Sequence, residues 1–179
     1  MPGNVIKQKQ GYSPYDFVEE ADLQSIAADM GIAPRVAGVE TFAGGVGDRI
    51  EMADARQNHH AVDELSPQMQ IQTAQQLGQL ALKGVRLEDR RAANVMRHNM
   101  TGRPMQIDFG IAGKMDSSQQ AAHLAHVTAE GFEAAGIGEM GSILRATVMD
   151  YLEGGDVAEA MDIAKQGFSR LQKIKGPLA

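Results

Sequence analysis

The apolar positions of residues 17–27 recur at helical spacing and predict an amphipathic helix. Ser13 and Pro14 come before this block and are typical of a helix start, whereas Gly31 is typical of a helix end. Further upstream, the short apolar run of residues 5–7 predicts a strand. The start of the chain is therefore expected to form one strand followed by one helix.

Short apolar runs after this helix predict two hairpins. RVAGVETF and DRIEMA, within residues 35–53, flank the glycine-rich AGGVGD. ANVMRH and PMQIDF, within residues 93–109, flank the turn sequence NMTG. Between the hairpins, QNHHAVDE predicts a solvated loop that leads into a helical block opened by Ser66 and Pro67.

The remainder of the chain has a helical pattern throughout. Three blocks, residues 117–135, 139–152 and 157–174, are separated by glycines. A part with strands and a helix, followed by a mostly helical part, is typical of the α+β class. We therefore expect an α+β fold.

Composition narrows the possible functions. Aromatic residues make up only 4% of the 179 residues and there are 11 methionines, so we expect an aliphatic, methionine-filled core. A net charge of -6 argues against a broad nucleic-acid-binding face. The absence of cysteine excludes disulfides, thiolate metal sites and cysteine nucleophiles. No apolar run approaches the roughly 20 residues of a membrane span, and no signal-peptide pattern opens the chain. We therefore expect a cytoplasmic protein, or one exported without a cleavable signal.

Two aspartates and an asparagine form a pattern suited to phosphoryl transfer. Asp108 follows an apolar run and precedes a glycine, so its carboxylate is expected at a strand end. Asn94 opens the partner strand, and Asp89 lies in the loop before it. Magnesium takes oxygen ligands of this kind together with phosphate oxygens. A further acid can orient the attacking hydroxyl.

The combined pattern is Asp89, four residues, Asn94, a hairpin and then Asp108-Phe109-Gly110. It resembles the catalytic-loop and metal-binding signatures of the protein-kinase superfamily. The resemblance implies that Asn94 and Asp108 hold Mg²⁺ with ATP. It implies that Asp89 is the catalytic acid that orients the acceptor hydroxyl, and that Arg91 offsets charge on the γ-phosphate.

The resemblance extends toward the N-terminus. Lys7, in VIK, matches the strand lysine that holds the α- and β-phosphates of ATP. A glutamate on the following helix is then expected to pair with it, and Glu20 fits the apolar spacing of that helix better than Glu19. Met52 and Ala53 lie in IEMADA, which matches the segment that links the two lobes and binds adenine through its backbone.

The chain departs from the kinase pattern at three places. No glycine-rich loop precedes Lys7, so the sequence represents either a minimal kinase without this flap or a piece of a longer product. Leu87 and Glu88 stand where the family has His-Arg, which argues against regulation by a phosphorylated activation loop. No Ala-Pro-Glu follows Asp108. These reductions resemble the compact kinases that bacterial secretion systems deliver into hosts as virulence effectors.

The resemblance implies a protein-kinase-like organisation. Residues 1–55 would form a reduced N-terminal lobe with a short sheet and one helix, and residues 56–179 a compact, mostly helical C-terminal lobe. The expected function is a minimal Ser/Thr protein kinase that acts on a protein substrate, in a host cell if the chain is a secreted effector. Two alternatives stay open: a pseudokinase binding module and a small-molecule phosphotransferase. The sequence does not indicate the oligomeric state.

Histidines offer weaker metal-binding candidates. His59 and His60 are adjacent, and neighbouring histidines seldom bind one metal. His123 and His126 share a helix face but lack a third ligand at a diagnostic spacing. We therefore expect structural or surface roles for these four residues.

Overall fold

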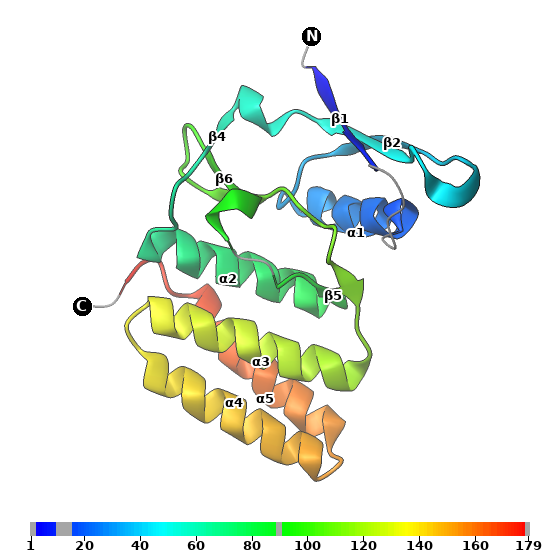
Figure 1. Ribbon diagram of the computed structural model, residues 1–179. Coiled ribbons are helices and arrows are strands. Elements are labelled where there is room, and N and C mark those ends of the chain that lie inside the picture. Colours follow the sequence, from blue (N-terminus) through cyan, green and yellow to red (C-terminus); the bar gives the residue numbers. More distant parts are fainter. Residues whose placement is uncertain (1–2, 10–15, 89–90, 178–179) are drawn as a thin grey trace. The chain divides into compact units, whose positions relative to one another are not determined.

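The structure is a computed structural model that describes residues 3–9, 16–88 and 91–177 (Figure 1). The described residues form five α-helices and small antiparallel sheets, which confirms the α+β class. The chain divides into two compact units. Unit 1 contains Met1–Glu64 and Asp89–Gly113, and unit 2 contains Leu65–Glu88 and Lys114–Ala179. None of the described helices has both the length and the apolar character needed to cross a membrane.

The first sheet of unit 1 packs against one helix. Strands β1 (Asn4–Gln8), β3 (Arg49–Ala53) and β2 (Val36–Glu40) form an antiparallel sheet in the order β1-β3-β2. Helix α1 (Phe17–Asp29) contributes to a core whose buried residues are Phe17, Ala21, Ile50 and Met52. The predicted strand, helix and first hairpin are thus confirmed.

Local capping explains where α1 begins and ends. The Asp16 carboxylate accepts hydrogen bonds from the backbone N–H groups of Val18 and Glu19 at the first turn. Gly31 has a φ of 74°, and the next residue, Ile32, donates its N–H back to the Ala27 carbonyl. Gly31 is therefore confirmed as the helix end. Ser13 and Pro14, the predicted start, lie outside the described residues.

A second antiparallel sheet in unit 1 contains β4 (His59–Ala61), β6 (Val95–His98) and β7 (Pro104–Gln106), in that order. Strands β6 and β7 confirm the second predicted hairpin. The prediction of a solvated loop at QNHHAVDE was wrong, because this segment contains β4. His59 is only 8% exposed, since its ring packs edge-to-face against the ring of His98 on β6, with 4.8 Å between centroids.

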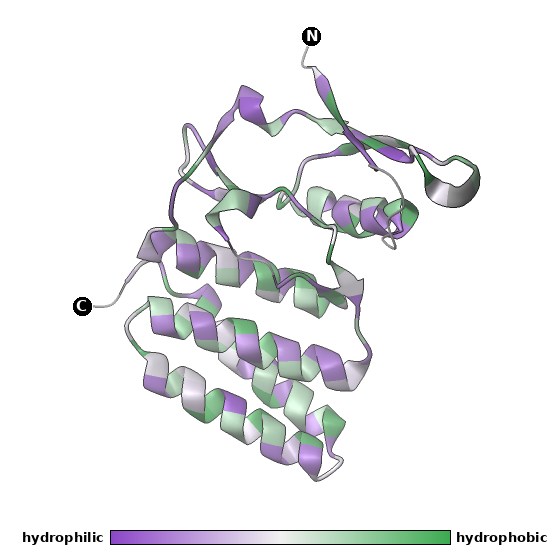
Figure 2. Ribbon diagram, viewed as in Figure 1, coloured by the Kyte–Doolittle hydropathy of each residue, from purple (hydrophilic) through white to green (hydrophobic). Residues whose placement is uncertain are grey.

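Unit 2 is built from four helices that pack side by side (Figure 1). They are α2 (Pro67–Leu82), α3 (Ser117–Ala134), α4 (Gly138–Glu153) and α5 (Val157–Gln172). Each carries hydrophobic and hydrophilic residues along its length (Figure 2), and the apolar faces form one core with Phe132 and Phe168 among its largest members. Short strands β5 (Val85–Arg86) and β8 (Gly113–Lys114) pair with each other.

The two compact units differ from the two expected domains, 1–55 and 56–179. Residues 56–64 and 89–113 belong to unit 1, because β4 pairs with β6 and so joins these stretches in one sheet. The segment with Asn94 and Asp108 was expected in the second domain. It lies instead in the same unit as Lys7 and Glu20.

Candidate active site

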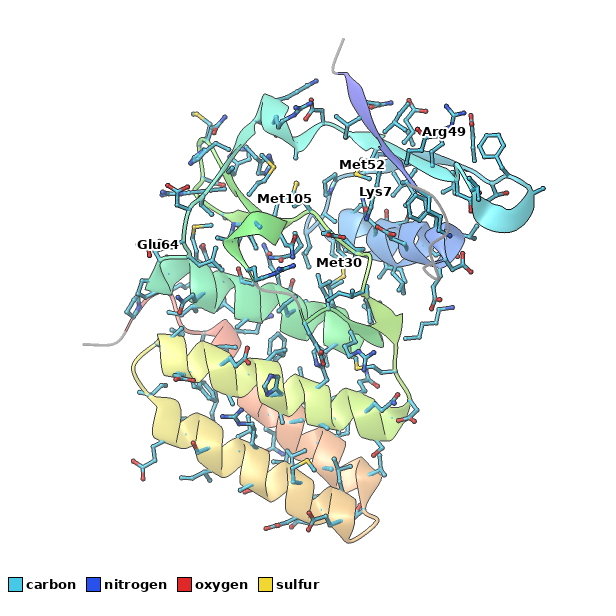
Figure 3. The ribbon with its side chains drawn as sticks, viewed as in Figure 1. Lys7, Met30, Arg49, Met52, Glu64 and Met105 are labelled. Atoms are coloured by element: carbon cyan, nitrogen blue, oxygen red, sulfur yellow. The ribbon has the colours of Figure 1, made fainter. Side chains whose placement is uncertain are left out.

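Lys7 and Glu20 form an ion pair inside unit 1. Alternation along β1 turns Lys7 toward α1, whereas its neighbour Ile6 is 58% exposed on the other face. Glu20 lies in the first turn of α1 and is only 4% exposed. Figure 3 shows Lys7 reaching from the sheet toward this helix. The glutamate expected to pair with Lys7 is therefore Glu20.

Asp108 supplies a second carboxylate to Lys7. Its Oδ1 atom lies 3.3 Å from the Lys7 Nζ atom. The same oxygen accepts a hydrogen bond of 2.9 Å from the Gly110 N–H, which fixes the side chain in a tight turn after β7. Asp108 is about half exposed, so one ammonium group bridges a buried carboxylate and an accessible one.

The electrostatic balance keeps Lys7 charged. Burial opposes the charged form, but the hydrogen bond and negative charge of Glu20 outweigh it, and Asp108 adds to the effect. The pKa of Lys7 is consequently raised above its ordinary value. The cluster therefore contains a permanent cation at neutral pH.

Gly110 lies directly beside this cluster. A Cβ atom at this position would be 3.1 Å from Asp108 Oδ1, 3.6 Å from Lys7 Nζ and 4.0 Å from Glu20 Oε2. A glycine leaves the space next to the charged groups open, which suits the approach of a ligand. This close approach is a structural feature that the turn pattern Asp-Phe-Gly alone does not specify.

Asn94 is placed by the hairpin that leads to Asp108. It ends the 3₁₀ turn Ala92–Asn94, and its carbonyl accepts a hydrogen bond of 3.0 Å from the Ile107 N–H. The residue next to Asp108 is thereby held against Asn94. The Asn94 side chain is 8% exposed, and its Nδ2 atom is buried without a hydrogen-bond partner among the described residues.

The catalytic-loop residues are only partly described. Asp89, the expected catalytic acid, lies outside the described residues. Arg91 is exposed, and its carbonyl accepts a hydrogen bond of 2.9 Å from the Asn94 N–H. In unit 2, Leu87 is buried, and the exposed Glu88 has a carboxylate oxygen 3.8 Å from Nδ1 of the buried His123.

Met52 and Ala53 belong to the central strand of the first sheet, and not to a separate linking segment as expected. The Met52 side chain is buried in the core beside α1, with Sδ 3.5 Å from Nε2 of Gln24. The Ala53 N–H donates a hydrogen bond of 2.8 Å to the Arg35 carbonyl. The backbone N–H of Ala53 is therefore engaged within unit 1, and the chain leaves the strand only at Asp54.

Of the four histidines, His59 and His60 lie in the strand β4 and not in the expected loop, whereas the two on α3 lie as expected. His123 is buried and His126 is exposed on α3, which agrees with the expected packing and surface roles. The Nε2–H group of His126 donates to Glu130 Oε1 at 2.8 Å, one turn further along the helix. Among the described residues, no group of three or more His, Asp or Glu side chains is arranged to hold a metal ion.

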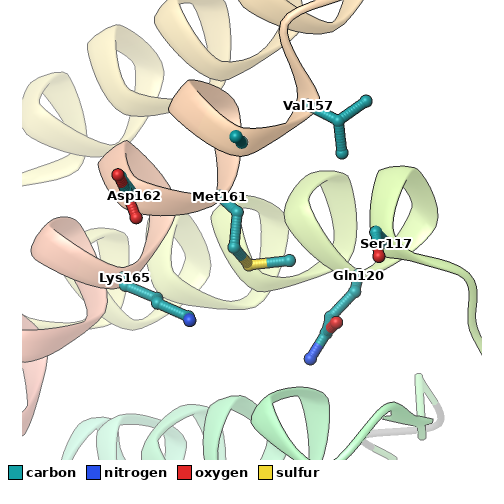
Figure 4. A pocket seen from close by; sticks show the side chains of 7 residues that line it. Ser117, Gln120, Val157, Met161, Asp162 and Lys165 are labelled. Carbon is teal, nitrogen blue, oxygen red and sulfur yellow. The ribbon is translucent and has the colours of Figure 1, made fainter.

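Unit 2 contains a separate pocket of about 580 Å³ between α3 and α5. Figure 4 shows its lining, which includes Ser117, Gln120, Met161, Asp162 and Lys165. Asp162 and Lys165 lie one helical turn apart on α5, so their opposite charges offset each other. The pocket has no concentration of charge comparable to that around Lys7.

The described part of the candidate site is thus a lysine between two carboxylates, with a glycine beside it and a buried carboxamide on the adjoining hairpin. No protein-family model matches the chain, and no curated protein matches it in sequence.

Proposed function

We propose that the chain is a minimal ATP-dependent phosphotransferase of the protein-kinase type that acts on Ser or Thr of a protein. The observation that carries this proposal is the cluster of Lys7, Glu20 and Asp108 in unit 1. A charged lysine next to a buried glutamate and an accessible aspartate can bind the phosphates of a nucleotide and a divalent cation. The order of these residues along the chain agrees with the kinase pattern.

Each residue has a definite task in this proposal. Lys7 donates hydrogen bonds to the α- and β-phosphate oxygens, and Glu20 keeps its ammonium in place. When the nucleotide occupies the site, Lys7 exchanges its 3.3 Å contact with Asp108 for the phosphates. The Asp108 carboxylate is then available to the cation. Asn94 contributes its amide oxygen, and Asp89 accepts the proton of the acceptor hydroxyl.

The described residues fit a magnesium nucleotide. Asp108 offers an accessible carboxylate, and Asn94 offers a neutral oxygen on the adjoining hairpin. Magnesium commonly uses one or two protein side chains and fills its shell with phosphate oxygens and water. When bound, the cation supplies neutralisation of charge on the β- and γ-phosphates. Arg91, which is exposed and always charged, offsets further charge on the transferred group.

The proposal also covers the place of action and the acceptor protein. The lack of an Ala-Pro-Glu segment after Asp108 supports a compact kinase of the type that bacterial secretion systems deliver into host cells. The acceptor would then be a host protein, and the chain would act in the host cytoplasm. If the adenine base lies against Met52 and Ala53, the Ala53 N–H does not bind it, because this group already donates to the Arg35 carbonyl.

The test is transfer of radiolabelled phosphate from ATP with magnesium to protein. Wild type is compared with Asp89→Ala and Asp108→Ala. Asp150→Ala, which removes an exposed aspartate of α4, is the matched control for these two variants. A second comparison sets Lys7→Met against its matched control, Lys9→Met. We expect label on protein with wild type and both controls. We expect a loss of at least about a thousandfold in Asp89→Ala and Asp108→Ala, because positioning and charge stabilisation dominate this chemistry.

Other outcomes identify the alternatives. A pseudokinase would bind nucleotide as wild type and would label no protein, whether as wild type or as any variant. A small-molecule phosphotransferase would consume ATP only after addition of an aminoglycoside or another small acceptor, in an Asp89-dependent way. Equal labelling by wild type and Asp108→Ala would contradict any role of this cluster in transfer.

A further inference from the structure

A groove between α4 and α5 in unit 2 is lined mostly by apolar side chains. Its volume is about 260 Å³. The lining includes Phe132, Met140, Ile143, Leu144 and Ile163, with Arg170 as a charged member. The groove lies entirely within unit 2 and contains none of the residues assigned to phosphoryl transfer.

Helix α4 has an apolar face that the core of unit 2 does not use. Leu144 and Val148 point into the core and are 8% and 0% exposed. Met140 and Ile143, one helical turn apart, line the groove and are 37% and 60% exposed. Exposed apolar residues that gather in a depression with a polar rim are typical of a binding surface. Methionine also adapts to varied partners.

The floor of the groove is preformed. A Cβ atom at Gly167 of α5 would lie only 2.6 Å from Cδ2 of Leu144, so the absence of a side chain lets α4 and α5 approach closely. Two packed helices then present a fixed depression, which reduces the ordering cost of binding. A groove between two helices is suited to the apolar face of a third helix.

Charge indicates which kind of partner fits. Arg170 is exposed at the last turn of α5 and forms no ion pair within the described parts of the chain. An acidic side chain next to apolar anchors would complement it. A second copy of this chain, with its net charge of -6, would be repelled, as would an anionic membrane surface.

We propose that the α4–α5 groove binds an amphipathic helix of a partner protein, with apolar side chains against Met140 and Ile143 and an acidic side chain against Arg170. This interaction goes beyond the proposed phosphotransfer and does not depend on it. Binding can therefore succeed or fail independently of catalysis.

The experiment measures fluorescence anisotropy of fluorescein-labelled helical peptides titrated with the full chain. The first peptide has leucines at i, i+4 and i+7 and a glutamate beside the last leucine. The second has lysine in place of glutamate, and the third has serines in place of leucines. The variants are Ile143→Gln and Arg170→Glu, both at exposed positions where the fold tolerates change. Met149→Gln is the matched control, because Met149 is 45% exposed on α4 but does not line the groove.

We expect wild type and Met149→Gln to prefer the glutamate peptide over the lysine peptide by about two- to fivefold, the range of a rim ion pair. Arg170→Glu should reverse this order. Ile143→Gln should weaken both leucine peptides by about tenfold. Equal binding of the serine peptide, or no change in Ile143→Gln, would overturn the proposal. A wild-type dimer in sedimentation that Ile143→Gln dissociates would assign the groove to a second copy and would also overturn it.

Discussion

A lysine between two carboxylates stabilises both of them, and Glu20 depends on it more because only 4% of its surface is exposed. Asp108 is about half exposed and can be solvated without Lys7. Removal of the ammonium would thus leave one charge with little water around it. A single residue, Lys7, therefore decides whether the buried carboxylate of Glu20 is tolerated.

Lys7→Met is expected to lower the free energy of unfolding by about 1–3 kcal/mol, because a buried carboxylate loses its hydrogen-bonded partner. Urea denaturation at neutral pH measures this change. Glu20→Gln in the Lys7→Met background should recover part of the loss, since no buried charge remains. The control is Lys9→Met, whose ammonium also lies over the Phe17 ring, 5.5 Å from its centroid, but belongs to neither ion pair. Equal stability of the two lysine variants would contradict the expectation.

Helix packing in unit 2 depends on a glycine at the contact between α2 and α5. A Cβ atom at Gly78 would lie 2.0 Å from Cε1 of Phe168, which is closer than any real contact. Helix propensity alone favours alanine over glycine by about 1 kcal/mol. At Gly78 the packing effect is larger and opposite in sign, because the buried Phe168 ring would have to move.

Gly78→Ala is therefore expected to destabilise the protein by about 1–3 kcal/mol. Thermal unfolding followed by circular dichroism measures it. Gly138→Ala, at the start of α4, is the matched control, because a Cβ there would be 3.7 Å from its nearest neighbour. A second variant, Phe168→Leu with Gly78→Ala, should recover stability relative to Gly78→Ala. An increase in melting temperature for Gly78→Ala alone would show that propensity outweighs packing.

The pairing of β4 with β6 makes stability depend on pH through His59. Burial lowers the pKa of His59, the bond to the Ala55 carbonyl opposes this, and His98 and His60 lower the pKa further. In the unfolded chain His59 regains its ordinary pKa of about 6.5 and binds protons more readily. The unfolded chain therefore binds more protons than the folded chain once the pH falls below about 6.5, and folding stability decreases as the pH falls further.

We expect the free energy of unfolding to decrease between neutral pH and about pH 5, and to decrease less in His59→Gln than in wild type. Urea denaturation at several pH values measures the slope. His126→Gln is the control, because His126 is exposed on α3 and does not contribute to the pKa of His59. Identical slopes in wild type and His59→Gln would rule out His59 as the source of the dependence.

Elements with a strong periodic pattern could be predicted, and those defined by pairing could not. The helical spacing of apolar residues indicated α2 to α5 with nearly the observed limits. The strand β4 has two histidines and no apolar alternation, so nothing local distinguishes it from a loop. Its partner, β6, is distant in the sequence and supplies the hydrogen bonds that define it.

The candidate site shows the same difference. The kinase resemblance indicated Lys7, Glu20 and Asp108, and the structure brings their charged groups together in unit 1. Their catalytic roles stay predictions. The hydrogen bond from the Ala53 N–H to the Arg35 carbonyl could not be predicted, because it depends on the path of the chain just before β2 begins at Val36.

For the whole molecule, the division into units follows the second sheet and not the order of the chain. Unit 2 is formed by Leu65–Glu88 and Lys114–Ala179, with residues 89–113 assigned to unit 1. Strands β5 and β8 pair with each other at the two ends of this insertion. One large buried cluster of unit 2 is formed by residues of that unit alone, and all four helices contribute to it.

Unit 2 is therefore expected to fold without unit 1. A chain of residues 65–88 joined to 114–177 by a short glycine-serine linker should be helical and should unfold cooperatively, because it keeps the buried cluster to which all four helices contribute. Circular dichroism and thermal unfolding measure both properties. The same linker design with Phe168→Ser, which removes a buried core ring, is the negative control. A fragment without a cooperative transition would show that unit 2 needs unit 1 to fold.

Lys7 and Asp108 are 101 positions apart, and this separation has a consequence during synthesis. Ribosomes add roughly 5–20 residues per second, so the growing polypeptide displays the lysine and its helical glutamate for seconds before the aspartate exists. An interrupted or prematurely released product that stops before residue 108 carries the ammonium with one carboxylate and no second one. Translation therefore completes this charged group of three late, and only in products that have passed residue 108.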